Sequence, residues 1–501
     1  MPLTKANDRI RLASRACMAD PVAPFERLED CRHRLLYRLL AKLGINPTRH
    51  GWKGWLRSEK AIPRSVLCDN RLLDMMVECA HDAFEEIGHP LARIASLLKS
   101  QMDPNDWRMV KRNAEGAWYT PLATSNHARV GTRERLLDVQ HRFPNQLKIE
   151  LDALATKVLF DDAHRAIGVE YLRGKRLYRA HDKPLNHALR CTVCASREVI
   201  LAGGAFNSPQ LLMLSGIGPQ ETLRRYDIPV RVALPGVGAN LQDRYEIGVV
   251  NRMAFDEWSV LRGAKFSLDD RLFLKWKRNR KGVYGTNGAA LALLKRSTAD
   301  RPLPDLLFLG LLGRFEGYFP GYSATFAKDR NYFTWAVLKA HTNNRAGEVT
   351  LRSADPRDVP SINFRYFQEG TADGGEDLDS VVDGIRFVRR MTGKLKEQGL
   401  VAEEERPGEK IQGDDDLKAF IRRHAWGHHA SCTCAIGPRE QGGVLSSDFK
   451  VHGTSNLRVV DASVFPRIPG FFIASSVYMI GEKAADVILA EANQNSKGIG
   501  N

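Results

Sequence analysis

The sequence predicts an α/β fold, and two stretches carry most of that prediction. In REVILAGGAFNSPQLLMLSGIGP, Glu198–Ala202 is a short apolar, β-branched run that two glycines interrupt. Ser208 and Pro209 then favour a helix start, because serine caps helices and proline suits the first helical position. The second stretch is NLRVVD at 456–461, followed by SSVYMIGEKAADVILAEA. Each stretch predicts a buried strand that leads into a helix, the repeating unit of an α/β sheet.

The ends of these two helices carry further expectations. The glycine turn at Gly203 and Gly204 should present free backbone N–H groups at the start of the first helix. The second helix should begin with Ser475 or Ser476 as its cap. Its apolar residues share one helical face, which predicts the side that packs on the core: Val477, Ile480, Ala484, Val487 and Ile488.

Other segments have clear periodicity. LKIELDALATKVLFD (147–161) and AIGVEYL (166–172) predict two strands joined by a turn. RHRLLYRLLAKLGI (32–45) and LLDMMVECAHDAFEEIG (72–88) have helical apolar spacing. The middle of the chain, from about Phe255 to Arg423, mixes strand-like and helical pieces and is expected to form a separate lobe.

Composition indicates a globular chain. Its 501 residues are 43% hydrophobic and 27% charged, which is ample for two or more domains. No run approaches the roughly 18 apolar residues of a membrane span, and the first residues lack the apolar core of a secretory signal. Eight cysteines are too few for a disulfide framework in a chain of this length. We therefore expect a soluble, cytoplasmic protein.

The net charge of +15 permits anionic partners such as nucleic acid. Basic and acidic clusters alternate along most of the chain, however, as in KRNRKGV and EEERPGE. Neither a long basic run nor a helix-turn-helix or aromatic-basic RNA motif is evident. A nucleic-acid-binding function is therefore not expected.

The stretch WGHHASCTCAIG (Trp426–Gly437) places two histidines beside two cysteines. It fits a metal site, a catalytic base with inert neighbours, or simple packing. The spacing of Cys432 and Cys434 does not match an ordinary zinc site, and the pair Cys191 and Cys194 lacks a matching second pair. We expect no bound metal. Two consecutive histidines among small residues favour a general base.

Taken together, these segments resemble the glucose–methanol–choline (GMC) oxidoreductases, a family of FAD-dependent alcohol oxidases and dehydrogenases that includes choline dehydrogenase. REVILAGGAFNSPQLLMLSGIGP is similar to the family's second signature nearly residue for residue. LPGVGANLQD (234–243) follows at the expected place, although the family often has histidine where Arg244 stands. By itself this GxG stretch does not fit a dinucleotide fingerprint and is as consistent with a plain turn. The family's C-terminal part is similar to four further stretches: GEVTLRSADPRDVPSINFRYF, HASCTCAIG, DFKVHGTSNLRVVDASVFP and GEKAADVIL. The resemblance covers about residues 51–490.

The resemblance implies both chemistry and site residues. It implies oxidation of the CH–OH group of a small-molecule alcohol, with His429 as the base that takes the hydroxyl proton while hydride passes to N5 of FAD. His428 is then a packing neighbour, and Cys432 and Cys434 are small fillers. The residues that the resemblance places against the cofactor are Val158, Asp461, Ala462 and Phe472. It names neither the alcohol nor the electron acceptor.

The resemblance also implies a domain order. Residues 1–120 form an N-terminal helical and loop region, and 121–254 form the first part of an FAD-binding domain of the glutathione-reductase type. Residues 255–423 form a substrate-binding domain on an antiparallel sheet, and 424–501 complete the FAD-binding domain.

Two departures from the family pattern stand out. The family's second active-site residue, a histidine or asparagine, should fall near Phe472, and phenylalanine can neither accept a proton nor hydrogen-bond an alkoxide. A GxGxxG turn is also not found before Gly51, so the FAD-binding domain is expected to be N-terminally incomplete and to bind FAD weakly or not at all. A truncated product or gene fragment, a start assigned too late, and a missing part supplied by another polypeptide all fit. A non-catalytic remnant of such an enzyme is the alternative function.

Overall fold

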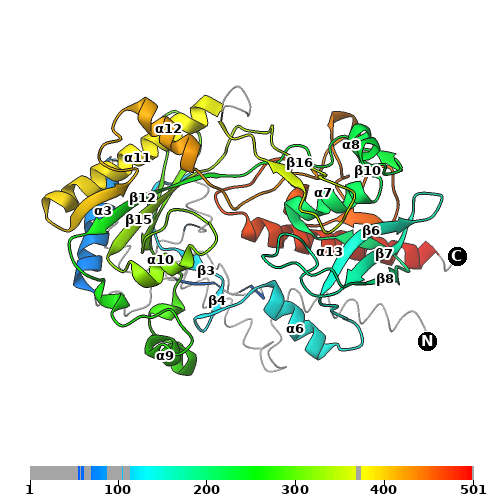
Figure 1. Cartoon of the computed structure of the whole chain (residues 1–501), viewed down its shortest axis with the longest axis horizontal. Helices are drawn as coiled ribbons and strands as arrows, with labels where there is room; N and C mark the ends of the chain where they lie inside the picture. Colours follow the sequence, from blue (N-terminus) through cyan, green and yellow to red (C-terminus); the bar gives the residue numbers. More distant parts are fainter. Residues whose placement is uncertain are drawn as a thin grey trace. The chain divides into compact units, whose positions relative to one another are not determined.

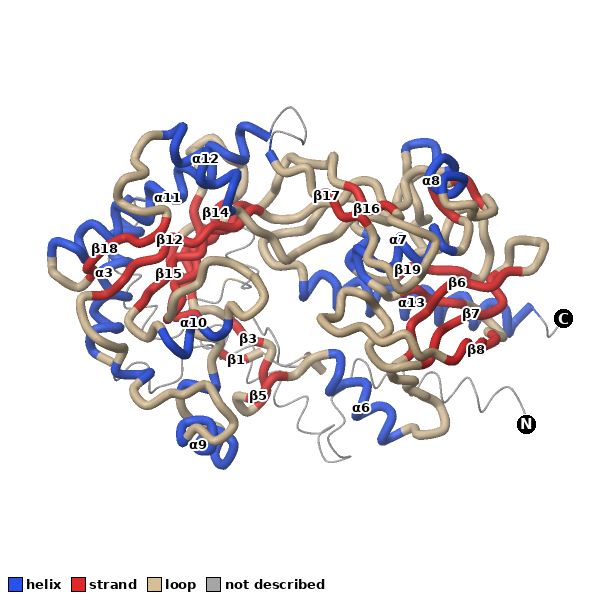
Figure 2. The backbone as a smooth tube through the Cα atoms, in the orientation of Figure 1, coloured by secondary structure: helices blue, strands red, loops and turns tan. Residues whose placement is uncertain are grey.

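The computed structural model of the chain describes residues 55–56, 58–60, 69–86, 104, 113–367 and 374–498. These residues divide into two compact units, each assembled from segments that lie far apart in sequence. Figures 1 and 2 label the elements of both units. The first unit consists of the described residues of Met1–Leu147, Tyr245–Ala340 and Leu378–Trp426, and the second of those of Lys148–Arg244, His341–Asp377 and Gly427–Asn501.

A six-stranded antiparallel sheet forms the centre of the first unit, in the order β18-β12-β15-β14-β13-β2. Strands β12 and β15 are buried over nearly their whole length, so both faces of the sheet are covered there. The antiparallel sheet predicted for the substrate lobe is present. Its strands are β2 (Gly116–Trp118), β12 (Tyr245–Met253), β13 (Ala289–Lys295), β14 (Leu306–Leu312), β15 (Tyr332–Lys339) and β18 (Val401–Arg406).

Helix α11 (Gly374–Glu397) packs on this sheet. The ring centroids of Phe387 on α11 and Phe308 on β14 lie 4.8 Å apart. Gly384 allows close approach, because a Cβ there would lie 2.6 Å from a methyl group of Val337 on β15. The other elements of this unit are α3 (Asn70–Glu86), α6 (Thr132–Arg142), α9 (Arg271–Asn279), α10 (Ser323–Lys328), α12 (Asp414–His424), the 3-10 turns η3 (Ser259–Leu261) and η4 (Val283–Gly285), and the short pairs β1 (Glu59–Lys60) with β3 (Pro121–Leu122) and β4 (Thr124–Ser125) with β5 (Ala128–Arg129).

Two small sheets organise the second unit. Strands β6 (Ala153–Phe160), β7 (Ala166–Arg173) and β8 (Leu189–Cys194) form an antiparallel sheet, and β9 (Val199–Leu201) pairs in parallel with β19 (Leu457–Val459). The parallel pair joins segments separated by more than half the chain. The remaining elements are α7 (Gly204–Leu214), α8 (Gln220–Arg225), α13 (Ala474–Gly498), the pairs β10 (Ile217–Gly218) with β11 (Val232–Ala233) and β16 (Glu348–Thr350) with β17 (Ser361–Asn363), and the 3-10 turns η6 (Arg439–Gln441) and η7 (Ala462–Val464).

Most predicted elements in the described residues are present. β6, β7, β9, β19, α3 and α13 lie where the apolar patterns place them. The predicted helix at 32–45 lies outside the described residues. Sequence reasoning missed β2, which lies within a region expected to contain only helices and loops, and β8, because its CTVC was weighed as a metal motif. The predicted domain boundaries remain a proposal.

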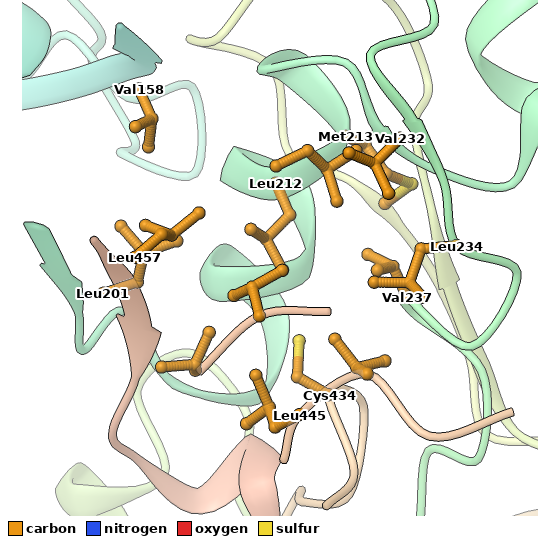
Figure 3. Close-up of a cluster of buried hydrophobic side chains, with 14 of the residues drawn as sticks. Val158, Leu201, Leu212, Met213, Val232, Leu234, Val237, Cys434, Leu445 and Leu457 are labelled. Carbon is orange, nitrogen blue, oxygen red and sulfur yellow. The ribbon is translucent and has the colours of Figure 1, made fainter. Parts of the chain in front are cut away.

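The predicted apolar face of α13 packs on the core of the second unit. Ala484 is buried, and Val477, Ile480 and Val487 are partly buried against the surrounding core clusters. The expected cap was wrong, since α13 begins at Ala474 and contains both Ser475 and Ser476. Figure 3 shows part of the larger core cluster, with Val158 from β6, Leu212 from α7 and Cys434 among its labelled side chains. Among the described residues, no helix combines the length and apolarity that crossing a bilayer requires.

The start of α7 differs from the prediction in an informative way. The helix begins at Gly204, so Pro209 lies inside it rather than at its first position. Proline lacks an N–H and therefore leaves the carbonyl four residues earlier, that of Ala205, without its helical donor. The hydroxyl of Thr433 donates to this carbonyl at 2.6 Å. A side chain from the HASCTCAIG stretch thus replaces the missing backbone bond.

This replacement can be measured. Thr433→Val should lower the free energy of unfolding by about 1–2 kcal/mol, because the buried Ala205 carbonyl loses its donor. In a Pro209→Ala background the new N–H can reach the same carbonyl, so the same substitution should cost less. Urea denaturation of the four proteins gives both losses. Equal losses in the two backgrounds would show that Thr433 does not serve this carbonyl.

Candidate active site

The carboxylate of Asp461 joins the segment that follows β19 to the start of α7. Asp461 follows β19 and caps η7, where its Oδ1 accepts from the N–H of Ser463 at 2.7 Å. Its Oδ2 accepts from the N–H of Gly204 at 2.9 Å and from the hydroxyl of Ser208 at 2.6 Å. Since Asp461 is only 6% exposed, these three donors replace the water that a carboxylate normally requires. The end of β19 and the start of α7 are therefore fixed to one another.

Two backbone donors at the start of α7, those of Gly203 and Gly204, are already engaged. The N–H of Gly204 is bound by Asp461, and the N–H of Gly203 donates to the Ser208 hydroxyl at 3.0 Å. The expectation of free N–H groups at this turn was therefore wrong. Ser208 acts from inside the helix, with its hydroxyl folded back over the turn, instead of capping a later helix start.

His429 lies on a loop that the segment before β12 holds in place. Gln242 and Ser431 exchange two backbone hydrogen bonds, of 3.1 and 3.0 Å. The N–H of His429 donates to Oδ1 of Asp243 at 2.8 Å. Gly427 lies so close that a Cβ there would be 2.5 Å from Oδ2 of Asp243, so this position requires glycine. The backbone on both sides of His429 is thereby anchored.

The imidazole of His429 is buried beside two other rings. The residue is 5% exposed, and its ring centroid lies 3.9 Å from that of His428 and 5.4 Å from that of Phe472. Burial, and then the positive charge of Arg244, lower the pKa of His429 to about 4. The imidazole is consequently neutral at pH 7 and able to accept a proton. His428, by contrast, is exposed.

Four of the five predicted site residues lie on adjoining segments. The N–H of Cys432 donates to the carbonyl of Ala462 at 3.1 Å, so the loop that carries His429 runs beside Asp461 and Ala462. Phe472 follows on the same polypeptide segment and is 41% exposed. Asp461, Ala462, His429 and Phe472 thus belong to one local arrangement.

Val158, the fifth predicted residue, lies elsewhere, on β6. Its side chain is part of the core cluster, and its N–H donates to the hydroxyl of Ser215 at 2.8 Å. It lines a cavity of about 580 Å³ that also borders Gly216 and Arg231. A second cavity, of about 440 Å³, lies among β6, β7, β9 and α7 and is lined mainly by apolar residues.

Cys432 and Cys434 are fillers, as expected. Both are 0% exposed, and each packs in an apolar cluster of the second unit. Burial raises the pKa of both thiols, that of Cys432 to about 12, so neither is an anionic metal ligand at neutral pH. Cys191 and Cys194 lie on β8, three residues apart and hence on opposite faces of that strand.

Sequence reasoning missed Asp243 and Arg244 as contributors to this site. The stretch LPGVGANLQD was weighed only for its glycines, although its last residues touch the His429 loop. One signal was present: Arg244 stands where the family often has histidine. A buried arginine at this position indicates that this part of the site differs from the usual family pattern.

Comparison with known proteins supports the resemblance. The sequence matches two family profiles, both described as GMC oxidoreductase, over residues 101–246 and 343–481. Among curated proteins, the oxygen-dependent choline dehydrogenases of Yersinia pseudotuberculosis and Burkholderia cenocepacia are each 34% identical over 366 residues, covering 73% of this chain and 60% of the relative. The chain therefore spans about 60% of the length of these relatives.

Solved structures agree on the fold. A variant of formate oxidase from Aspergillus oryzae is 24% identical with a TM-score of 0.70, covering 88% of this chain and 73% of that chain. A fungal aryl-alcohol oxidase is 22% identical with a TM-score of 0.58, covering 79% of this chain and 70% of that chain. At these identities the likeness establishes the α/β architecture alone.

The cysteine geometry yields a metal prediction. Protein purified without added metal should contain far less than one zinc per chain, because two of the cysteines are sealed in apolar cores. Elemental analysis by mass spectrometry measures the metal content. Stoichiometric zinc that disappears in a Cys191→Ser, Cys194→Ser variant would contradict this expectation.

Burial of neutral His429 also predicts a pH dependence of stability. The folded-state pKa of His429, about 4, lies below the usual histidine pKa of 6.5, so the unfolded chain takes up a proton first as pH falls. This histidine should therefore destabilise the fold progressively from about pH 6.5 down to pH 4, by up to about 3 kcal/mol. Urea denaturation across this range should show a shallower pH dependence for His429→Asn than for the unsubstituted protein. Parallel curves for the two proteins would mean that His429 titrates normally.

Proposed function

Because the chain belongs to the GMC oxidoreductase family, we propose that it acts in the FAD-dependent oxidation of an alcohol to a carbonyl compound, with His429 as the base. Members of this family share an α/β fold with an FAD-binding and a substrate domain, and FAD is their cofactor. The observation that carries the proposal is the neutral, buried imidazole of His429, anchored through its backbone beside Asp461 and Ala462.

The residues of the second unit fit the cofactor at its flavin end. Phe472 lies beside His429 and directly before the first turn of α13, whose leading N–H groups have no partner within the helix. The positive end of a helix dipole favours negative charge, as on an anionic reduced flavin. Phe472 would lie at this end, Asp461 and Ala462 beside the pyrophosphate and ribityl chain, and Val158 in the strand beside the adenine. At the start of α7, by contrast, the N–H groups of Gly203 and Gly204 are engaged by Ser208 and Asp461.

The proposed chemistry requires a base with these properties. When bound, FAD accepts the hydride that leaves the carbinol carbon. His429 accepts the hydroxyl proton at a ring nitrogen, and positioned proton transfer of this kind contributes roughly 10²–10⁴-fold to rate. An imidazole with a pKa near 4 is too weak a base to build up a free alkoxide. The proton therefore moves to His429 as the hydride departs, and the low exposure of the ring limits competition from water.

Phe472 shapes what the site accepts. Where the family uses a polar second residue, this chain places an aromatic ring 5.4 Å from that of His429. The proposed substrate is therefore an alcohol with an apolar group next to its carbinol carbon, since a phenyl ring offers packing but no hydrogen bond. Relatives described as choline dehydrogenase and aryl-alcohol oxidase span both cationic and aromatic alcohols.

Substitution of the two histidines tests the base assignment. In flavin-loaded protein, His429→Ala should lower the turnover of an aryl alcohol by about 100-fold or more, because proton removal loses its positioned acceptor. His428→Ala is the matched control: it removes the exposed neighbour and should have a much smaller effect. Stopped-flow reduction of the flavin absorbance measures the chemical step directly. A larger loss in His428→Ala would assign the base to the wrong histidine.

A further inference from the structure

Residues 240–244 (Asn-Leu-Gln-Asp-Arg), called here the bracket segment, touch two loops of the second unit. One is the His429 loop, residues 427–433, and the other is residues 466–472, the Phe472 loop. Gln242 contacts both: its backbone pairs with Ser431, and its Oε1 accepts from the N–H of Ile468 at 3.2 Å. The bracket segment therefore lies where the two site loops approach one another.

Arg244 makes the densest set of contacts with the Phe472 loop. It is 0% exposed. Its Nε donates to the carbonyl of Phe471 at 3.3 Å, and its Nη2 donates to the carbonyls of Ile468 at 3.3 Å, Pro469 at 2.7 Å and Gly470. A guanidinium has five N–H donors in a rigid planar fork, so it can hold several successive carbonyls at once. Four consecutive residues directly before Phe472 are tied to this one side chain.

Asp243 holds the other loop from the neighbouring position. Its Oδ1 accepts from the N–H of His429 at 2.8 Å and from that of Arg244 at 2.7 Å. Its own carbonyl accepts from the hydroxyl of Thr342 at 3.0 Å. Two consecutive residues of the bracket segment thus reach the backbone on both sides of the His429–Phe472 contact.

We propose that Arg244 is a positioning residue: by holding the Phe472 loop through its carbonyls, it keeps Phe472 against the ring of His429 and fixes the base in one orientation. This rests on the proposed function, in which His429 is the base. Arg244 thereby orders the loop that carries Phe472. In the family, a second polar residue at about the position of Phe472 would hydrogen-bond the substrate.

The charge of Arg244 adds to its geometric role. Charged or titratable neighbours of His429 in the second unit include Arg244 and Asp243 on the bracket segment and His428 on its own loop. His341 lies next to the Phe472 loop, with its ring 6.1 Å from that of Phe471. After burial, the guanidinium of Arg244 is the cause that lowers the pKa of His429. Loss of Arg244 should therefore loosen the loop and also let His429 take up a proton at higher pH.

Arg458 provides a matched control. It belongs to the same unit, is 3% exposed, and is tied to Glu198 at 2.6 Å and Glu491 at 2.7 Å, away from the bracket segment. A buried arginine that serves only stability should behave like Arg458. Arg458→Met should destabilise the protein without changing the Phe472 loop selectively.

The experiment compares Arg244→Met, Arg244→Lys and Arg458→Met by hydrogen–deuterium exchange and mass spectrometry. Arg244→Met should raise amide exchange in residues 466–472 by about tenfold or more, because hydrogen bonds from a charged donor are lost. The pH midpoint of His429, read from exchange of its ring C2 hydrogen, should move upward. Arg244→Lys should keep the low midpoint, since it retains the charge, while the loop still exchanges faster because an ammonium cannot hold four carbonyls. Arg458→Met should change neither readout.

Three outcomes would overturn the proposal. The first is an unchanged amide exchange rate at 466–472 in Arg244→Met, and the second is an equal rise of that rate in Arg458→Met. The third is an unchanged pH midpoint of His429 in Arg244→Met, combined with an unchanged exchange rate at 466–472 in Arg244→Lys. If Arg244→Met does not fold, Arg244→Lys decides by loop exchange alone. The readouts need no turnover, so unchanged turnover in His429→Ala would overturn the proposed function and leave the hold of Arg244 on the Phe472 loop standing.

Discussion

The second unit depends on one buried carboxylate. Asp461 accepts three hydrogen bonds, and its donors come from the start of α7 and from η7. A buried carboxylate is costly unless donors surround it, so the segments that supply those donors must meet in one geometry. The parallel pairing of β9 with β19 and the course of the His429 loop beside η7 are consistent with that meeting. The hydrogen bonds to the Asp461 carboxylate therefore set the position of the site, and the apolar core packs around them.

Around this point, polar side chains replace missing backbone bonds. Thr433 serves the carbonyl that Pro209 leaves open, and Arg244 serves carbonyls of the loop before Phe472. Each of these contacts joins two segments that are distant in sequence. At least one of the two segments has no regular secondary structure. Irregular backbone can be rigid when its polar groups are satisfied in this way. That rigidity suits a site whose base and aromatic neighbour both lie on loops.

The sequence predicts the periodic parts of this architecture and not the irregular ones. Apolar, β-branched runs predict β9 and β19, and a 3.6-residue apolar stripe predicts the buried face of α13, because these signals are local. Pro209 was placed at a helix start because only its local preference is visible, while its compensating partner Thr433 lies 224 residues further along the chain. His429 was found through family resemblance, since two adjacent histidines among small residues allow several roles. The partners of Arg244 are backbone carbonyls. Every residue has one, so the sequence does not indicate which of them accept from Arg244.

The long sequence separation of these contacts has a consequence for synthesis of the chain. Gly204 and Asp461 are 257 positions apart, so the start of α7 lacks its carboxylate until the ribosome has added 257 further residues. At about 5–20 residues per second, that interval is roughly 13–50 seconds. During it, α7 and β9 must wait with apolar surface uncovered while the intervening segment emerges. This protein should therefore need chaperone protection during translation, and slow synthesis should reduce its yield more than that of a protein whose domains are continuous in sequence.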